Sequence, residues 1–331
     1  MSLKCYNYTM GKVNFIVDKR TELIANLLRI SQCNDYVTEH FCLLKDEYFL
    51  NALKVFSPFK SEKVILLARK LGKTEKGFTY DNCIRLAFLL EDDFSYNGRW
   101  DEYFDREFCN ADLVKNFLSS IKDFVVLTEF ERFYTTQIPF YEQKLSELSQ
   151  VFDGDEFDVI IRDLFQNPKN INFCVNFVPS LVNANHGFKS GQVIFANIGT
   201  FSEDNTKSMT FDRGYQHIII HEFMHSFVNP LTENLDIYDF DIKKSAREYE
   251  NTRAYVNETI TRALTIKIRE LMTGEKFDRL LLRERQAGFD LVEDVYQKLD
   301  EYTAKMQSWD EYFPTILNVF SINKVMEINK K

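Results

Sequence analysis

DRGYQHIIIHEFMHSFVNP, residues 212–230, is the stretch that decides the fold. It has a single glycine near its start, and its isoleucine, phenylalanine and methionine residues make it apolar on most sides, as in a helix buried in a core. Asp212 suits an N-cap position, and Asn229-Pro230 is expected to end the helix. The sequence therefore predicts a core helix over about residues 212–227.

The middle of this helix carries the pattern HExxH, formed by His221, Glu222 and His225. Residues four apart lie one above the other on a helix, so the two imidazoles can bind one Zn²⁺ together. Glu222 projects about 100° round the helix from His221, where it can take a proton from a water that the metal activates. The sequence therefore predicts His221 and His225 as metal ligands and Glu222 as the general base.

Chance is a weak explanation of the pattern. With five histidines and 50 acidic residues among 331, a random HExxH is expected in roughly one such chain in a hundred, which bounds the false-positive risk of the motif. The alternative is a buried helix with two packed histidines. His217, one turn before His221, is either a residue behind the site or an ordinary packed histidine.

A tetrahedral zinc site needs a third protein ligand. Val228 and Leu231 stand where HExxHxxGxxH would have glycine and histidine, and no histidine follows His225, so the ligand is expected to be a carboxylate. The downstream candidates considered are Glu233, Asp236, Asp239, Asp241, Glu248, Glu250 and Glu258.

Glu258 is the preferred third ligand. It lies in a second predicted helix, residues 245–272, and a ligand on a helix packed beside the first is held more firmly than one on a loop. Arg262 follows one turn later and can orient the carboxylate. A solvated Glu–Arg pair is the alternative, and Glu248 and Glu250 remain open as ligands.

The motif and the downstream glutamate resemble the gluzincin branch of the zincin metallopeptidases. That resemblance implies zinc held by His221, His225 and Glu258, with Glu222 as base. The run HEFMHSFVNP (residues 221–230) and the pair Asn257-Glu258 also resemble an uncharacterised bacterial family of unknown function, which implies a zincin-like fold over most of the chain. Gluzincins place a Tyr or His to stabilise the oxyanion, and four candidates remain open: Tyr255, Tyr238, Tyr249 and His186.

Composition and periodicity predict a mainly α protein with a small β-sheet (α+β), in which a zincin-like catalytic core carries additional helices. Glycine (11) and proline (6) are scarce, and long stretches have helical spacing. Apolar runs predict strands at residues 13–17, 172–178 and 192–198. The last is either the edge strand that pairs with an extended substrate or an internal strand.

Two regions are expected along the chain: a mainly helical N-terminal region, residues 1–152, and a zincin-like catalytic region with C-terminal helices, residues 153–331. They can also form one continuous domain.

The net charge of −9, without a basic stripe, argues against a nucleic-acid partner. No apolar run approaches the roughly 20 residues of a membrane span. Six cysteines without a CxxC pair are expected to be buried free thiols in a reducing compartment. No signal peptide is visible, which favours a cytoplasmic protein, or a secreted one if a signal was removed.

The functional prediction is a zinc-dependent hydrolase, in the first place a metallopeptidase that cleaves a peptide or protein substrate. One alternative is a zincin-fold protein without peptidase activity that acts as a binding module. The other is a helical interaction protein whose HExxH is accidental.

Overall fold

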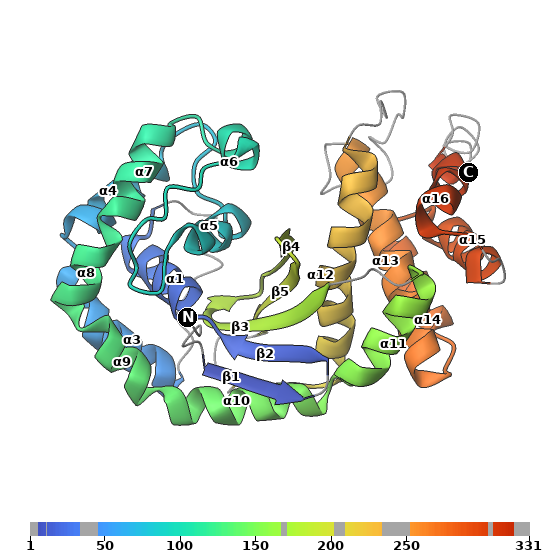
Figure 1. Cartoon of the computed structure of the whole chain (residues 1–331), viewed down its shortest axis with the longest axis horizontal. Coiled ribbons are helices and arrows are strands. Elements are labelled where there is room, and N and C mark those ends of the chain that lie inside the picture. Colours follow the sequence, from blue (N-terminus) through green and yellow to red (C-terminus); the bar gives the residue numbers. More distant parts are fainter. Residues whose placement is uncertain are drawn as a thin grey trace.

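The structure is a computed structural model that describes residues 6–10, 12–33, 46–166, 171–201, 209–233, 252–303 and 307–320. Figure 1 shows a small sheet at the centre, one group of helices on its left, a second group on its right and a long helix beneath it. The prediction of a mainly α protein with a small β-sheet is confirmed.

The helices fall into two sets along the chain. Before the third strand come α1 (Lys19–Ser31), α3 (Glu47–Phe56), α4 (Lys63–Leu71), α5 (Tyr80–Leu86), α6 (Glu102–Glu107), α7 (Ala111–Ser119), α8 (Ile121–Thr128), α9 (Phe130–Thr136), α10 (Ile138–Gln150) and α11 (Gly154–Leu164). After the last strand come α12 (Arg213–Thr232), α13 (Thr252–Thr273), α14 (Asp278–Gln286), α15 (Val292–Thr303) and α16 (Trp309–Leu317).

The sheet has five strands in the order β1-β2-β3-β5-β4. Their bounds are β1 (Tyr6–Met10), β2 (Val13–Val17), β3 (Asn172–Val182), β4 (Asn185–Ser190) and β5 (Val193–Thr200). The two outer pairs, β1 with β2 and β4 with β5, are antiparallel, whereas β3 runs parallel to both β2 and β5. The three predicted strands are confirmed, and β1 and β4 were not predicted.

Of the two alternatives left open for residues 192–198, the structure shows the internal strand, because β5 lies between β3 and β4. Its sequence, VIFANIGT, is apolar since neighbours cover it on both sides. The outer strands of the described sheet are β1 and β4, and the sequence of β4, NHGFKS, is mostly polar. A polar strand of this kind is typical of a sheet edge, where one side meets solvent.

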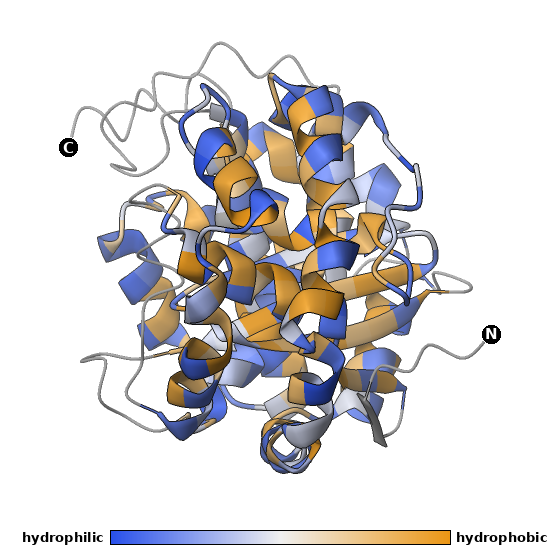
Figure 2. Cartoon of the chain, turned by 90° about the vertical axis from the view of Figure 1, so that its left-hand side faces the viewer, coloured by the Kyte–Doolittle hydropathy of each residue, from blue (hydrophilic) through white to orange (hydrophobic). Residues whose placement is uncertain are grey.

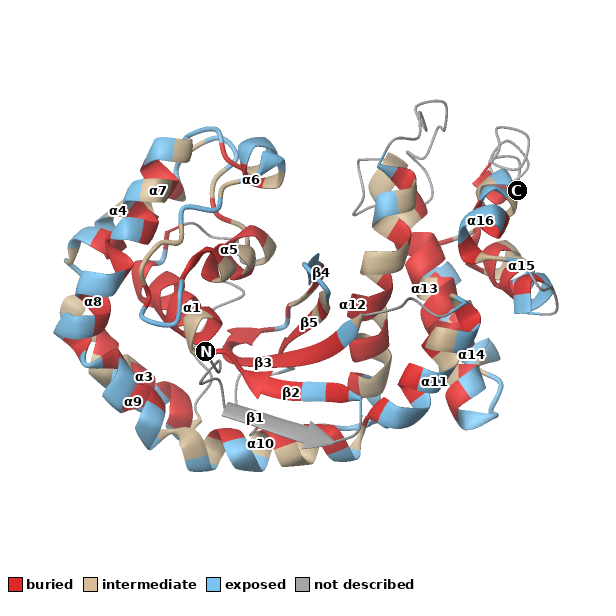
Figure 3. Cartoon of the chain, viewed as in Figure 1, coloured by how far each residue is buried: buried red, intermediate tan, exposed pale blue. Residues whose placement is uncertain are grey.

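Aromatic side chains join α12 to the sheet. The ring of Phe223 on α12 lies 5.3 Å from the ring of Phe157 on α11 and 5.1 Å from that of Phe173 on β3. All three side chains are buried, and Figure 3 shows the buried colour along β3 and the side of α12 that faces it. Aromatic pairs at these distances stabilise a core beyond the burial of their area. Helix α12 is therefore anchored to rigid neighbours.

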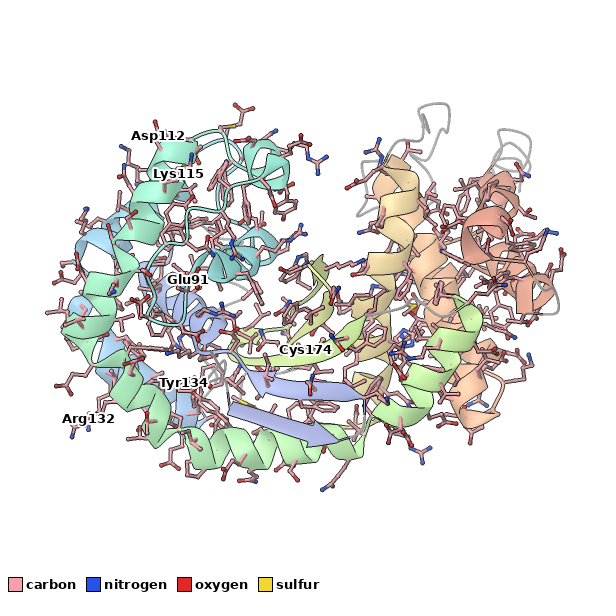
Figure 4. The ribbon with its side chains drawn as sticks, viewed as in Figure 1. Glu91, Asp112, Lys115, Arg132, Tyr134 and Cys174 are labelled. Carbon is pink, nitrogen blue, oxygen red and sulfur yellow. The ribbon has the colours of Figure 1, made fainter. Side chains whose placement is uncertain are left out.

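The helices that lie on the left of the sheet in Figure 1 are amphipathic. Figure 2 shows hydrophobic stretches alternating with hydrophilic ones along them, as expected for helices with one side on the core. A hydrogen bond ties this layer to the sheet, because the hydroxyl of Tyr134 on α9 donates to the backbone oxygen of Val17 at 2.5 Å. Figure 4 shows Tyr134 on that helix and Cys174 on β3.

The end of α12 differs from the prediction. Asp212 does cap the helix, since its side chain accepts from the N–H of Gly214 at 2.7 Å. Pro230, however, lies inside the helix, which continues to Thr232. A proline so close to the end removes only one hydrogen bond of the last turn, so the helix tolerates it there.

The expected burial of the cysteines holds for three of the four that the structure describes. Cys33, Cys83 and Cys174 are buried free thiols, and Cys109 is free but exposed. No helix among the described residues is long and apolar enough to cross a membrane. The division into residues 1–152 and 153–331 stays a prediction; the sheet takes strands from both sides of residue 152.

Candidate metal and catalytic site

The three predicted metal ligands come together between α12 and α13. Nε2 of His221 lies 3.2 Å from Nε2 of His225 and 3.3 Å from Oε1 of Glu258, and the Nε2 of His225 lies 3.8 Å from Oε2 of Glu258. No other group of three histidine, cysteine or acidic donors in the described part of the chain meets this closely. Two imidazole nitrogens and one carboxylate fit a divalent zinc with its fourth position open.

The charges in this trio depend on one another. Burial disfavours the charged form of Glu258, but the neighbouring His221, then His225 and Arg262, hold its pKa well below the usual range. Burial also opposes a charge on His221, yet the Glu258 carboxylate raises its pKa. Burial and the charge of His221 lower the pKa of His225 to about 4. Without a metal, Glu258 therefore favours the charged form of His221, and His221 in turn favours the anionic form of Glu258.

Glu222 lies against the edge strand. Only 7% of its surface is exposed, and burial raises its pKa to about 7, although the backbone N–H of Gly187 binds the carboxylate and lowers it. A Cβ atom at Gly187 would lie 1.8 Å from the backbone oxygen of Glu222, so only glycine allows this approach of β4 to α12. A carboxyl group with a pKa near neutrality suits a general base.

Arg262 contacts Glu258, the predicted third ligand, as expected from the sequence. Its Nη2 lies 2.8 Å from Oε1 of Glu258, one turn earlier on α13. Its guanidinium also lies over the ring of Phe289, 4.2 Å from the ring centre. The pair is partly buried rather than a solvated surface pair, since Glu258 is 9% and Arg262 25% exposed at the side chain.

A cleft of about 570 Å³ opens beside His225. Residues of α5, α6, β4 and the C-terminal half of α12 line it, so it lies between the two groups of helices, above the edge strand (Figure 1). Arg106 on α6 and Glu233 at the end of α12 approach to 3.8 Å across it. The cleft therefore connects His225, one of the three predicted ligands, with solvent and with the β4 edge of the sheet.

Two of the four candidates for stabilising the oxyanion, Tyr255 and His186, lie within the described residues. Tyr255 is 2% exposed, and its ring stacks on Phe289 at 5.8 Å, which is a packing role. His186, on β4, lines the cleft, and burial is the main reason that its pKa falls to about 4. Tyr238 and Tyr249 lie outside the described residues, as do Glu248 and Glu250.

His217 is packed one turn before His221. Burial, followed by the charge of His221 and nearby arginines, lowers its pKa well below the usual value. No hydrogen bond or ion pair of the described residues joins it to the three donors, so it is not assigned a role in the site.

The chain belongs to the family described as "Domain of unknown function (DUF4932)", whose model matches residues 93–319. The matched range includes the whole of α12 and α13 and every predicted site residue. The expected likeness to a family of unknown function is confirmed. No curated protein and no solved structure matches the chain.

Proposed function

We propose that this protein is a zinc-dependent peptidase of the gluzincin type. The observation that carries the proposal is the convergence of His221, His225 and Glu258 from two packed helices, with Glu222 beside them and a cleft alongside. A chance HExxH on a packed helix gives no reason for a carboxylate 33 residues further on to meet both imidazoles. A zinc ion held by these three donors would activate a water and polarise the scissile carbonyl.

The chain's own residues then supply the proton transfers. Glu222 has a pKa of about 7, so near neutral pH it can accept a proton from the attacking water and return it to the leaving amine. The N–H of Gly187 holds the carboxylate against the edge strand while this happens. Because Glu222 is buried, bulk water has little access to its carboxyl group, and the proton stays there until it is passed to the leaving amine.

An extended peptide is the substrate that the edge strand suits. The backbone N–H of Gly187 binds Glu222 and therefore points away from β5. Along an antiparallel edge strand, the backbone N–H and C=O groups of every second residue point away from the neighbouring strand. The N–H and C=O of Lys189 are therefore expected to point away from β5 as well. Lys189 also lines the cleft. A peptide that pairs with β4 there would be held by backbone hydrogen bonds close to His225.

Replacing Glu222 by Gln tests the catalytic assignment. The amide keeps the shape of the side chain but cannot take the proton, so we expect cleavage of a peptide library to fall about 100- to 10,000-fold while zinc content stays at about one per chain. The control is Glu293→Gln, which changes a partly exposed glutamate of α15 paired with Arg285. Full activity in Glu222→Gln would contradict the proposal, and zinc binding without any cleavage by the wild type would favour a binding module.

A further inference from the structure

Behind the third metal ligand lies a second buried carboxylate that the sequence did not reveal. Glu284 on α14 is 2% exposed, and one of its carboxylate oxygens contacts Nη1 of Arg262. The other nitrogen of the same guanidinium, Nη2, lies 2.8 Å from Oε1 of Glu258. One arginine therefore joins two carboxylates that belong to different helices.

The guanidinium is fixed from a third direction. Its centre lies 4.2 Å above the ring of Phe289, which in turn stacks on Tyr255 at an angle of 9° between the rings. Arginine donates hydrogen bonds in a planar fork, so partners at both ends and a ring on its face leave it one orientation. The Glu258 carboxylate is held against an arginine that cannot turn away.

The charges give this arrangement a further effect. A lone guanidinium beside Glu258 would compete with a metal ion for the carboxylate and repel the ion. Glu284 offsets that positive charge from the far side, with Arg283 as its other ionic neighbour at 3.2 Å. Without Glu284, Arg262 would place its full charge on the ligand.

We infer that Glu284 is a positioning residue for the metal site, which acts through Arg262 to orient Glu258 and to keep it available to a cation. The inference rests on the zinc site proposed above and assigns to α14 a part in metal affinity. Residues that orient metal ligands in this way commonly change affinity by about 10- to 100-fold when they are replaced.

The test measures zinc affinity of the full chain by competition with a chromophoric chelator. Glu284→Gln is expected to weaken zinc binding about 10- to 100-fold. The control Glu293→Gln changes a partly exposed glutamate of α15 that pairs with Arg285 of α14, and it should leave zinc affinity within about twofold of the wild type. A purely structural Glu284 would lower the unfolding temperature of the metal-free protein but leave zinc affinity well below that temperature unchanged. That result would overturn the inference.

A double-mutant cycle tests the route through Arg262. After Arg262→Met, the further change Glu284→Gln is expected to alter zinc affinity little, because the link is already broken. Full additivity would exclude Arg262 as the intermediary. If Glu284→Gln does not fold, Arg262→Lys keeps the charge but not the fork, and it should weaken zinc binding as well.

The outcomes separate this inference from the proposed activity. Wild-type protein that binds zinc without cleaving peptides, together with a weakened Glu284→Gln, would refute the peptidase and keep the positioning role. A wild type that cleaves peptides, together with a Glu284→Gln variant that binds zinc as tightly as the wild type, would keep the peptidase and refute the positioning role. A wild type that binds no added zinc would refute both.

Discussion

Two buried glutamates of this chain are held in opposite ways. Glu22, on α1, is 0% exposed and is bound mainly by neutral donors: the hydroxyl of Tyr48, the hydroxyl of Ser180 at 2.5 Å and the side-chain amide of Asn26 at 2.8 Å. Glu258, on α13, instead meets two imidazoles and a guanidinium.

The pKa values of the two carboxyl groups shift in opposite directions. Burial raises the pKa of Glu22, and its hydrogen bonds only partly offset this. At Glu258 burial acts in the same direction, but the charges of His221, His225 and Arg262 prevail and lower the pKa. Neutral donors enclose a carboxyl group as a packing element, whereas cationic partners keep it an anion that a metal can use. The following predictions test this distinction.

The largest effect is expected from Glu258→Ala. The loss of one of three ligands should weaken zinc binding by more than about 100-fold, since even changes behind a ligand cost 10- to 100-fold. Elemental analysis and chelator competition measure this on purified protein. Wild-type zinc content in the variant would remove Glu258 from the site and reopen the choice among the other acidic residues.

Glu22→Ala should act on stability alone. It leaves the buried Tyr48 and Ser180 hydroxyls without their acceptor, so the free energy of unfolding in urea is expected to fall by about 2–4 kcal/mol. Zinc affinity should stay within about twofold of the wild type. The matched control is Glu131→Ala, which removes an exposed partner of Lys19 and should change stability by less than about 0.5 kcal/mol. A large loss of zinc affinity would show that the two glutamates are not independent.

The smallest effect is a difference in pH dependence. The folded pKa of Glu22 is raised, so its contribution to stability is present below the ordinary value of 4.5 and is lost as pH rises through the folded pKa. Glu258 has a lowered pKa, so its contribution is present above 4.5 and is lost as pH falls. Urea unfolding of metal-free wild type and Glu22→Gln over a pH series measures this. The stability advantage of the wild type should shrink as pH rises; an advantage that grows would reverse the assignment for Glu22.

The sequence predicted the parts of the site that follow from helix geometry. His221, Glu222 and His225 sit within one and a half turns, and Glu258 and Arg262 are one turn apart on α13, so local spacing was enough to place them on common faces. The choice of Glu258 over the other acids used only the expectation of a second rigid helix. The structure brings that residue to the two histidines.

The parts that were missed depend on contacts between distant segments. The link from Arg262 to Glu284 joins two helices, and neither residue differs locally from any surface charge. Strand β4 was not predicted because its sequence has no apolar run; an edge strand needs none. Gly187 belonged to the same segment, and only the approach of α12 reveals why it is glycine.

That contact also restricts how this family can change its loops. A one-residue insertion within β4 would move Phe188 or His186 to the place where Gly187 meets Glu222, and neither fits where even a Cβ would lie 1.8 Å from the backbone. A two-residue shift would keep the faces of the strand but bring Asn185 or Lys189 there. The tip of the hairpin at Gly191, where a Cβ would meet nothing within 4 Å, is open. We therefore expect that, within the β4–β5 hairpin, relatives differ in length only at this tip.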